Sequence, residues 1–149
     1  MLIRKANTTD FDRLTEIWLE ASVQAHHFVE PEYWQEKAAD MKNSYLPSSE
    51  TFVFEDGDGV LLGFVSLVEE HIAAFFIDTE VQRKGVGSQL LLWLQQHYDD
   101  LTLNVYSRNT GAIQFYKKYN FTEIEEKREG DTGELEYLMA WKRRQELEK

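Results

Sequence analysis

Cysteine is absent from the 149 residues of this chain. Its absence excludes disulfide bonds, thiol catalysis and cysteine-ligated zinc together. Long apolar runs are also missing, since none approaches the roughly 20 residues that cross a bilayer. The first residues, Met1 to Lys5, lead directly into polar sequence and do not resemble a signal peptide. We therefore expect a cytoplasmic protein with no membrane partner.

Positive charge is scarce, because 16 Lys and Arg residues face 27 Asp and Glu residues, for a net charge of -11. An acidic surface repels nucleic acid and anionic lipid, and it attracts cationic substrates such as amines. The same acidity can serve only to keep a protein soluble, so it does not identify a partner by itself. The hydrophobic content of 42% argues against disorder. The length of the chain suits a single domain with one hydrophobic core.

Hydrophobic periodicity divides the chain into short strands and amphipathic helices. The turn Asp56-Gly57-Asp58-Gly59 predicts a hairpin, because Asp and Gly tolerate positive φ. The almost wholly apolar segment from Ile72 to Ile77 predicts a central strand. A run of antiparallel strands followed by strand–helix–strand–helix–strand indicates an α+β fold with one central sheet. The expected strands are 2–5, 51–55, 60–68, 72–77, 101–106, 121–126 and 135–141. The first expected helix follows Thr8 or Thr9, and the others begin at 31, 86 and 110.

Local signals set the expected ends of the first two helices. Thr8 or Thr9 predicts the N-cap of the first helix, and residues 21–30 are expected to be irregular. Pro31 suits the first turn of the second helix, which we expect to end before Pro47.

A glycine-rich turn, Gln82-Arg83-Lys84-Gly85-Val86-Gly87, connects the strand that ends at Ile77 to the next helix. A helix N-terminus carries unpaired N–H groups, and glycines let the backbone approach an anion closely. Arg83 and Lys84 add positive charge that suits a pyrophosphate. The dinucleotide fingerprint is excluded because Leu90 stands where its third glycine belongs, and a P-loop lacks its Gly-Lys-Ser/Thr ending. The alternative is a strand–helix connection that binds nothing.

The context of this turn resembles the GNAT superfamily of N-acetyltransferases. The segments that carry the resemblance follow one another as Phe75-Phe76-Ile77-Asp78, the glycine turn, Asn109, and Phe115-Tyr116-Lys117-Lys118-Tyr119-Asn120-Phe121. The resemblance spans nearly the whole chain and is closest to small bacterial members, including those that acetylate protein lysines or N-termini. It implies a mixed α/β (α+β) GNAT fold, with a central, mostly antiparallel, twisted sheet of six or seven strands, splayed in the middle and flanked by about four helices. Residues 1–149 would form a single domain, with 143–149 as a charged, frayed C-terminal tail.

The resemblance also implies acetyl-CoA as co-substrate and no metal. Backbone N–H groups from Arg83 to Ser88 would hold the pyrophosphate, the strand end Phe75 to Ile77 would pair with the pantetheine arm, and a bulge there would splay two strands. Asn109 matches the asparagine that contacts the arm, and Tyr116 matches the tyrosine that faces the thioester sulfur. The implied cofactor-binding residues are Phe75, Phe76, Ile77, Gln82, Arg83, Lys84, Gly85, Val86, Gly87, Ser88, Asn109 and Tyr116.

The sequence departs from the family pattern at two asparagines. Asn120 stands where a glycine usually precedes Phe121, and asparagine tolerates the left-handed conformation of a helix C-terminus. Asn104 stands where some members carry a glutamate base. That second departure leaves the general base unassigned by the motif.

An attacking amine must be neutral, yet a free lysine amine has a pKa of about 10.4 and is mostly charged at neutral pH. We assign to Tyr116 the donation of a proton to the leaving thiolate, the alternative being a plain helix aromatic. We nominate His26, in a loop that flanks the acceptor site, as the base. The alternative for His26 is a loop histidine on the surface or packed on Phe28. Residues 69–71 (Glu-Glu-His) offer a relay through water or a plain solvated turn. Two tryptophans and a tyrosine could line the acceptor pocket or belong to the core: Trp18, Tyr33 and Trp34.

We therefore predict an enzyme that moves an acetyl group to a primary amine by direct attack in a ternary complex. The amine belongs to a protein lysine, a protein N-terminus or a small molecule. The alternatives are a CoA-binding sensor without turnover, which Asn104 favours, and an unrelated nucleotide binder. The sequence does not determine the acceptor, the use of other acyl groups or the oligomeric state. A homodimer with the terminal strand as its contact is one option that the resemblance implies.

Overall fold

The computed structural model describes residues 2–82 and 84–143. Its centre is a seven-stranded sheet in the order β1-β2-β3-β4-β5-β7-β6. All neighbouring strands are antiparallel except β4 and β5, which are parallel. The expected α+β architecture is confirmed, and the apolar fourth strand is central. The strands are β1 (Leu2–Lys5), β2 (Glu50–Glu55), β3 (Leu61–Val68), β4 (His71–Ile77), β5 (Asp100–Tyr106), β6 (Thr122–Arg128) and β7 (Leu135–Lys142).

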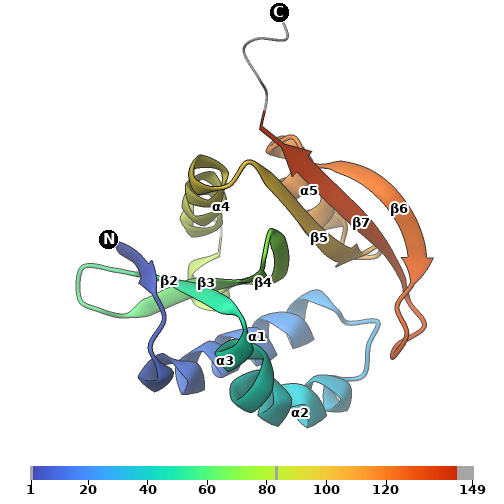
Figure 1. Cartoon of the computed structure of the whole chain (residues 1–149). Helices are drawn as coiled ribbons and strands as arrows, with labels where there is room; N and C mark the ends of the chain where they lie inside the picture. The colour runs from blue at the N-terminus through green and yellow to red at the C-terminus, as the bar shows by residue number, and fades with distance from the viewer. Residues whose placement is uncertain (1, 83, 144–149) are drawn as a thin grey trace, which may run out of the picture.

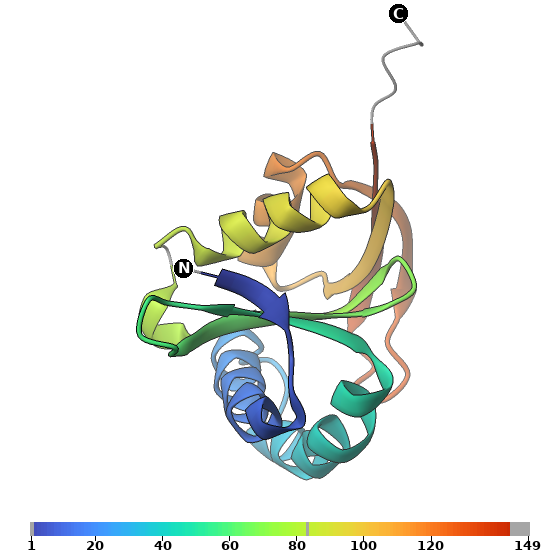
Figure 2. The same cartoon turned by 60° about the vertical axis from the view of Figure 1, so that its left-hand side comes forward.

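Helices cover both faces of this sheet, as Figures 1 and 2 show. One face carries α1 (Phe11–Ala25) and α2 (Pro31–Asp40), together with a π-helical turn, η2 (Met41–Tyr45), and the short α3 (Leu46–Ser48). The opposite face carries α4 (Val86–His97) and α5 (Thr110–Lys118). None of the helices in the described part of the chain combines the length and apolar character that a bilayer span needs.

Each layer is held by a helix face whose apolar residues recur at helical spacing. In α1 the buried positions include Leu14, Ile17 and Trp18, which pack against β2, β3 and β4. In α4 the expected leucines, Leu90, Leu91 and Leu94, are completely buried, whereas Trp93 is only partly covered. Burying a leucine side chain contributes about 1.5–3 kcal/mol, so these faces fix where the helices lie.

The first two helices differ from expectation at their ends. Neither Thr8 nor Thr9 is the N-cap, because residues 8–10 form a 3-10 turn in which the Asp10 carboxylate accepts a hydrogen bond from the Asn7 N–H at 2.7 Å. Arg4 pairs with the same carboxylate at 2.9 Å. The helix also continues through Ala25, so only residues 26–30 of the expected irregular segment lie outside a helix.

The second helical region runs past Pro47, where we expected it to stop. Pro47 lies in the first turn of α3, directly after η2. The π-helical turn η2 joins α2 to α3 and keeps Met41 and Leu46 buried.

The C-terminal end is anchored as far as the structure describes it. Arg143 was expected to fray with the tail, but its guanidinium bonds the Asp99 carboxylate at 2.8 Å and the Gln95 carbonyl at 2.7 Å. The rest of the expected tail, 144–149, lies outside the described residues. Strand β7 lies between β5 and β6, so the terminal strand has no free edge through which a dimer could pair.

A bulge at Ala73 opens the sheet in its middle. Ser66 pairs with Ala74 while its neighbour Leu67 pairs with Ile72, which leaves Ala73 as the extra residue. The bulge reverses the alternation of β4, so that Ile72 and Ala74 pack into opposite cores although they are two residues apart. Pairing between β4 and β5 ends at Ile72 and Leu103, and the two strands then diverge, as Figure 1 shows. The splay that the family resemblance implied is thus present.

Candidate active site

A cavity of about 860 Å³ lies where β4 and β5 separate. It is bounded by the end of β4, the start of α4, the inner face of α5 and the C-terminal part of α1. The predicted site residues that line it come from four separate segments of sequence. They are His26, Phe75, Phe76, Ile77, Gln82, Gly85, Gly87, Ser88, Asn109 and Tyr116.

The start of α4 has the features of an anion site. Gly85 precedes the helix with φ +86, a left-handed conformation that favours glycine, and a Cβ added there would meet nothing within 4 Å. No side chain among the described residues caps this helix, so the first N–H groups of α4 keep their hydrogen-bonding capacity and partial positive charge. Lys84 and Val86 do not line the cavity with their side chains, and Arg83 lies outside the described residues.

Two polar contacts hold the glycine turn in place. The Gln82 side-chain amide donates to the Ile77 carbonyl at 3.3 Å, which ties the turn to the end of β4. The Tyr119 hydroxyl donates to the Ser88 hydroxyl at 2.6 Å, which ties the first turn of α4 to α5. The glycine turn is therefore held to β4 on one side and to α5 on the other.

Tyr116 lies on the buried face of α5 and faces the cavity. Its ring packs edge-on against Phe75, at 6.1 Å between centroids, and Phe115, at 5.4 Å. Burial raises the pKa of its phenol well above the ordinary value, because the apolar surroundings disfavour the phenolate. Tyr116 is consequently a neutral proton donor at physiological pH.

The buried His26 and the half-buried Asn109 form a pair in the cavity wall. The Asn109 Oδ1 accepts from the Ala112 N–H at 3.2 Å, which caps α5, and its Nδ2 donates to His26 Nε2 at 3.2 Å. That donor makes Nε2 the unprotonated nitrogen and places the proton on Nδ1, which has no hydrogen-bond partner among the described residues. Burial among aromatic rings lowers the pKa of His26 to about 4. The imidazole is therefore neutral at physiological pH.

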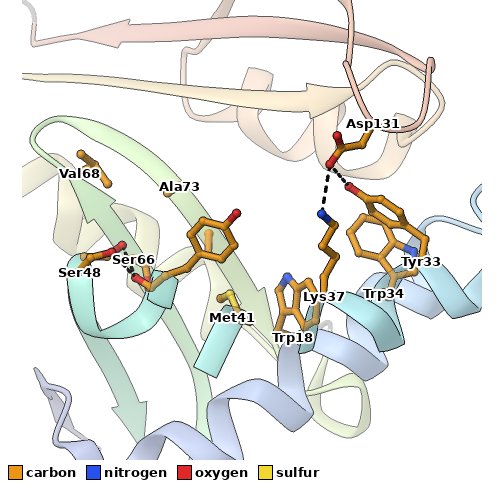
Figure 3. A pocket seen from close by; sticks show the side chains of 13 residues that line it. Trp18, Tyr33, Trp34, Lys37, Met41, Ser48, Ser66, Val68, Ala73 and Asp131 are labelled. Atoms are coloured by element: carbon orange, nitrogen blue, oxygen red, sulfur yellow. Dashed lines mark hydrogen bonds and ion pairs between the residues drawn. The ribbon is translucent and has the colours of Figure 1, made fainter. Parts of the chain in front are cut away.

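A second cavity, of about 340 Å³, adjoins the first and shares Trp18, Trp34, Ala73 and Ala74 with it. Figure 3 shows that Asp131 faces Lys37 and Tyr33 across its mouth. The Asp131 carboxylate accepts from the Tyr33 hydroxyl at 3.1 Å and pairs with Lys37 at 3.5 Å.

These contacts join the hairpin between β6 and β7 to α2. The sequence analysis left open whether Trp18, Tyr33 and Trp34 line a pocket or belong to the core, and the two tryptophans do both. Trp18 and Trp34 are buried and also line both cavities.

The structure leaves one predicted cluster outside the site and adds residues that the sequence did not suggest. Glu69 and Glu70 occupy the exposed turn after β3, and His71 bonds the Thr102 hydroxyl at 2.7 Å, so none of the three lines either cavity. Tyr106 and Glu136, which pair across β5 and β7, both line the larger cavity. No motif flagged them, because their sequence neighbours carry no signature and only the sheet register brings them to the cleft.

The splayed sheet, the uncapped glycine turn and the buried phenol define an acyl-CoA transferase class of site. The sequence model described as Acetyltransferase (GNAT) domain matches residues 15–135. The chain belongs to the GNAT family and is an N-acetyltransferase, an enzyme that transfers an acetyl group to an amine.

Two Escherichia coli (strain K12) proteins are similar to this chain over most of its length. Peptidyl-lysine N-acetyltransferase YiaC is 33% identical over 94% of this chain and 96% of its own. Peptidyl-lysine N-acetyltransferase YjaB is 33% identical over 80% of each chain. The solution structure of apo-form YjaB superposes with a TM-score of 0.83 at 28% identity, covering 93% of this chain and 95% of that one.

Proposed function

We propose that this enzyme transfers the acetyl group of acetyl-CoA to the side-chain amine of a lysine in a protein or peptide. The observation that carries the proposal is the cavity between β4 and β5, which brings Tyr116, the β4 end and the uncapped start of α4 to one place. The names of the two bacterial relatives support lysine as the acceptor. A protein N-terminus and a small amine are the other acceptors that the assay below includes.

The residues present fit acetyl-CoA. The open space at Gly85 and the N–H groups of the first turn of α4 suit the pyrophosphate, and the unpaired edge of β4 from Ala73 to Ile77 suits the pantetheine amides. Among the proposed pyrophosphate residues, Lys84 and Val86 would act through backbone N–H groups, because their side chains lie outside the cavity. When bound, acetyl-CoA supplies an acetyl group activated as a thioester, so that a C–N bond forms as the C–S bond breaks.

Tyr116 supplies the proton that the departing sulfur needs. Its phenol is neutral, lines the cavity and lies beside Phe75 of β4, which supports the role of a general acid. The role of His26 as a base stays a prediction, and two features weigh against it: Nε2 already accepts from Asn109, and the lowered pKa makes it a weak base. We propose instead that His26 holds Asn109 in place at the N-terminus of α5.

The second cavity suits the acceptor side of the reaction. Aromatic walls from Trp18 and Tyr33 suit the methylene chain of a lysine. The net charge of -11 attracts cationic acceptors at long range.

Replacing Tyr116 by phenylalanine tests this function. Release of CoA thiol is followed with acetyl-CoA and a panel of lysine peptides, peptides with free N-termini and small amines. We expect turnover of at least one acceptor by the natural chain and a loss of about 10²-fold or more in kcat for Tyr116→Phe, with acetyl-CoA affinity unchanged by calorimetry.

The matched control is Tyr98→Phe, which removes a hydroxyl that bonds Glu50 away from the cavity. It should keep full turnover. CoA binding without thiol release across the panel would leave the sensor without turnover as the better description. Unchanged turnover in Tyr116→Phe would remove the phenol from the mechanism.

Three further expectations complete the proposal. The relatives are bacterial proteins, which supports a bacterial enzyme, and we propose the cytoplasm as its location. A single domain over 1–149 is supported by the one continuous sheet. Homodimerisation stays a prediction, and mass measurement by light scattering checks it.

A further inference from the structure

The larger cavity contains one carboxylate among the described residues that line it, and that carboxylate belongs to Glu136. The proposed reaction needs a group that removes a proton from the acceptor ammonium. His26 is neutral but already hydrogen bonded through its basic nitrogen, and the amide of Asn104 cannot take up a proton. We infer that Glu136 is the proton acceptor for the attacking amine, an inference that rests on the proposed function.

Sheet register places Glu136 on the face of the sheet that packs against α1 and α2. In β5 the residues Leu101, Leu103 and Val105 pack into the core beneath α4 and α5, so the alternate residues face the other way. Tyr106 is one of these, and Glu136 pairs with it across β5 and β7. Directly paired residues of an antiparallel ladder share a face, so Glu136 lies beside Tyr106 and two pairs along the ladder from Asn104.

The neighbouring acids are already engaged, and Glu136 is not. Glu134 pairs with Arg108 at 3.2 Å, and Asp131 pairs with Lys37. Glu129 accepts from the Thr132 N–H at 2.8 Å and from the Thr132 hydroxyl at 2.9 Å. Among the described residues no hydrogen bond or ion pair reaches the Glu136 side chain, so its oxygens remain free to bind an ammonium group.

The charges around Glu136 tune it toward this role. Burial raises its pKa, the nearby Glu129 raises it further, and Lys127, which faces it across β6 and β7, partly offsets the rise. The phenol of Tyr106 is the titratable group that faces it from β5, and burial raises the pKa of that phenol to about 12, so it stays neutral. A carboxylate whose pKa lies above its ordinary value is a stronger base.

The proton accounting closes within the named groups. One N–H bond of the acceptor ammonium breaks, an O–H bond forms on Glu136, and the electron pair left on nitrogen becomes the nucleophile. The proton that nitrogen loses as the amide forms replaces the one that Tyr116 gives to sulfur. Glu136 returns its own proton to solvent, so one proton is released for each acetyl group transferred to a charged amine.

The test compares Glu136→Gln with the natural chain in kcat/KM for the best lysine peptide of the panel, from about pH 6 to about pH 10, near the pKa of a free lysine amine. We expect a loss of about 10²-fold near pH 7 and a difference that shrinks as pH rises, because more of the amine is then already neutral. Glu136→Asp should keep part of the rate and the acidic limb of the pH profile. Acetyl-CoA affinity, measured by calorimetry, should not change in either variant.

The control is Glu125→Gln on β6, which removes the same charge from an exposed position outside both cavities and should behave as the natural chain. A natural rate and pH profile in Glu136→Gln would overturn the inference and leave the proposed function standing. Loss of acetyl-CoA binding in that variant would also overturn it, since the role would then be structural. A natural chain that acetylates no amine of the panel would overturn the proposed function and the inference with it.

Discussion

At the residue scale, burial sets the protonation of both titratable side chains that the sequence nominated. It keeps the Tyr116 phenol protonated, which an acid requires, and it keeps His26 neutral but weakly basic. The same physical effect therefore makes Tyr116 a weaker acid and His26 a weaker base than the free side chains. The Asn109 side chain makes two contacts: its oxygen caps α5, and its nitrogen donates to the basic nitrogen of His26.

Stability should depend on His26 as the pH falls. Its pKa is about 4 in the folded chain against an ordinary value of 6.5, so below about pH 6.5 the unfolded chain binds a proton that the folded chain refuses until about pH 4. Folded stability is therefore fully present above that range and decreases through it, by about 2 kcal/mol between about pH 7.5 and about pH 5.

Urea unfolding of His26→Gln at the two pH values measures this contribution. The glutamine variant should lose less stability than the natural chain over this range, because its amide does not titrate. His27→Gln, at the exposed neighbouring position, is the matched control and should follow the natural chain. Equal pH dependence in His26→Gln and the natural chain would contradict the prediction.

At the scale of elements, two local irregularities shape the site: a bulge in β4 and a left-handed glycine before α4. The extra residue at Ala73 changes which side chains of β4 face each core and coincides with the end of its pairing with β5. Gly85 lets the chain enter α4 in a left-handed conformation with open space in front of the helix. Asn120 has φ 73 after α5, which is the left-handed conformation that asparagine tolerates at a helix C-terminus.

Replacing Gly85 by valine should weaken acetyl-CoA binding by about tenfold or more. A β-branched side chain costs about 1–2 kcal/mol in this left-handed conformation, and its methyl groups would enter the space in front of the α4 N–H groups. Calorimetry with CoA gives the affinity, and thermal unfolding gives the strain.

Gly59→Val provides a matched control for the strain alone. Gly59 also has a left-handed φ, +82, with nothing within 4 Å of an added Cβ, and it lies in the turn between β2 and β3. It should lose similar stability and keep CoA affinity. Equal affinity losses in the two variants would show that the effect is not local to the α4 turn.

At the scale of the whole molecule, charge and sheet edges govern encounters with partners. The outer strands of the sheet are β1 and β6. Strand β6 is exposed along its whole length and carries Glu123, Glu125 and Glu126, which oppose edge-to-edge pairing by repulsion. A dimer, if light scattering detects one, should therefore form through another surface.

The acidic balance should make acetylation of cationic acceptors sensitive to salt. We expect kcat/KM for a lysine peptide flanked by arginines to fall severalfold as ionic strength rises from about 0.01 M to about 1 M, where the Debye length shrinks from about 30 Å to about 3 Å. The same peptide flanked by glutamates serves as the control and should show no fall. Identical salt responses would show that the net charge does not guide the acceptor.

The sequence by itself determined the elements, their order and the residues that we propose for acetyl-CoA binding. Hydrophobic periodicity and turn residues are local, so the strands and the helix faces could be read directly, and the glycine turn with Tyr116 and Asn109 follows a linear motif. Helix ends near Asp10 and Pro47 were wrong because an ion pair and a π-helical turn overrode local propensity.

Only the tertiary structure decided the acceptor side. The register of β5 and β7 brings Glu136 to the cavity, and the packing of α1 buries His26 against Asn109. The hairpin between β6 and β7 carries Asp131 to Lys37 in α2, which is far away in sequence. Proton affinity and contact across such distances depend on burial and three-dimensional proximity, and no local pattern of residues records either.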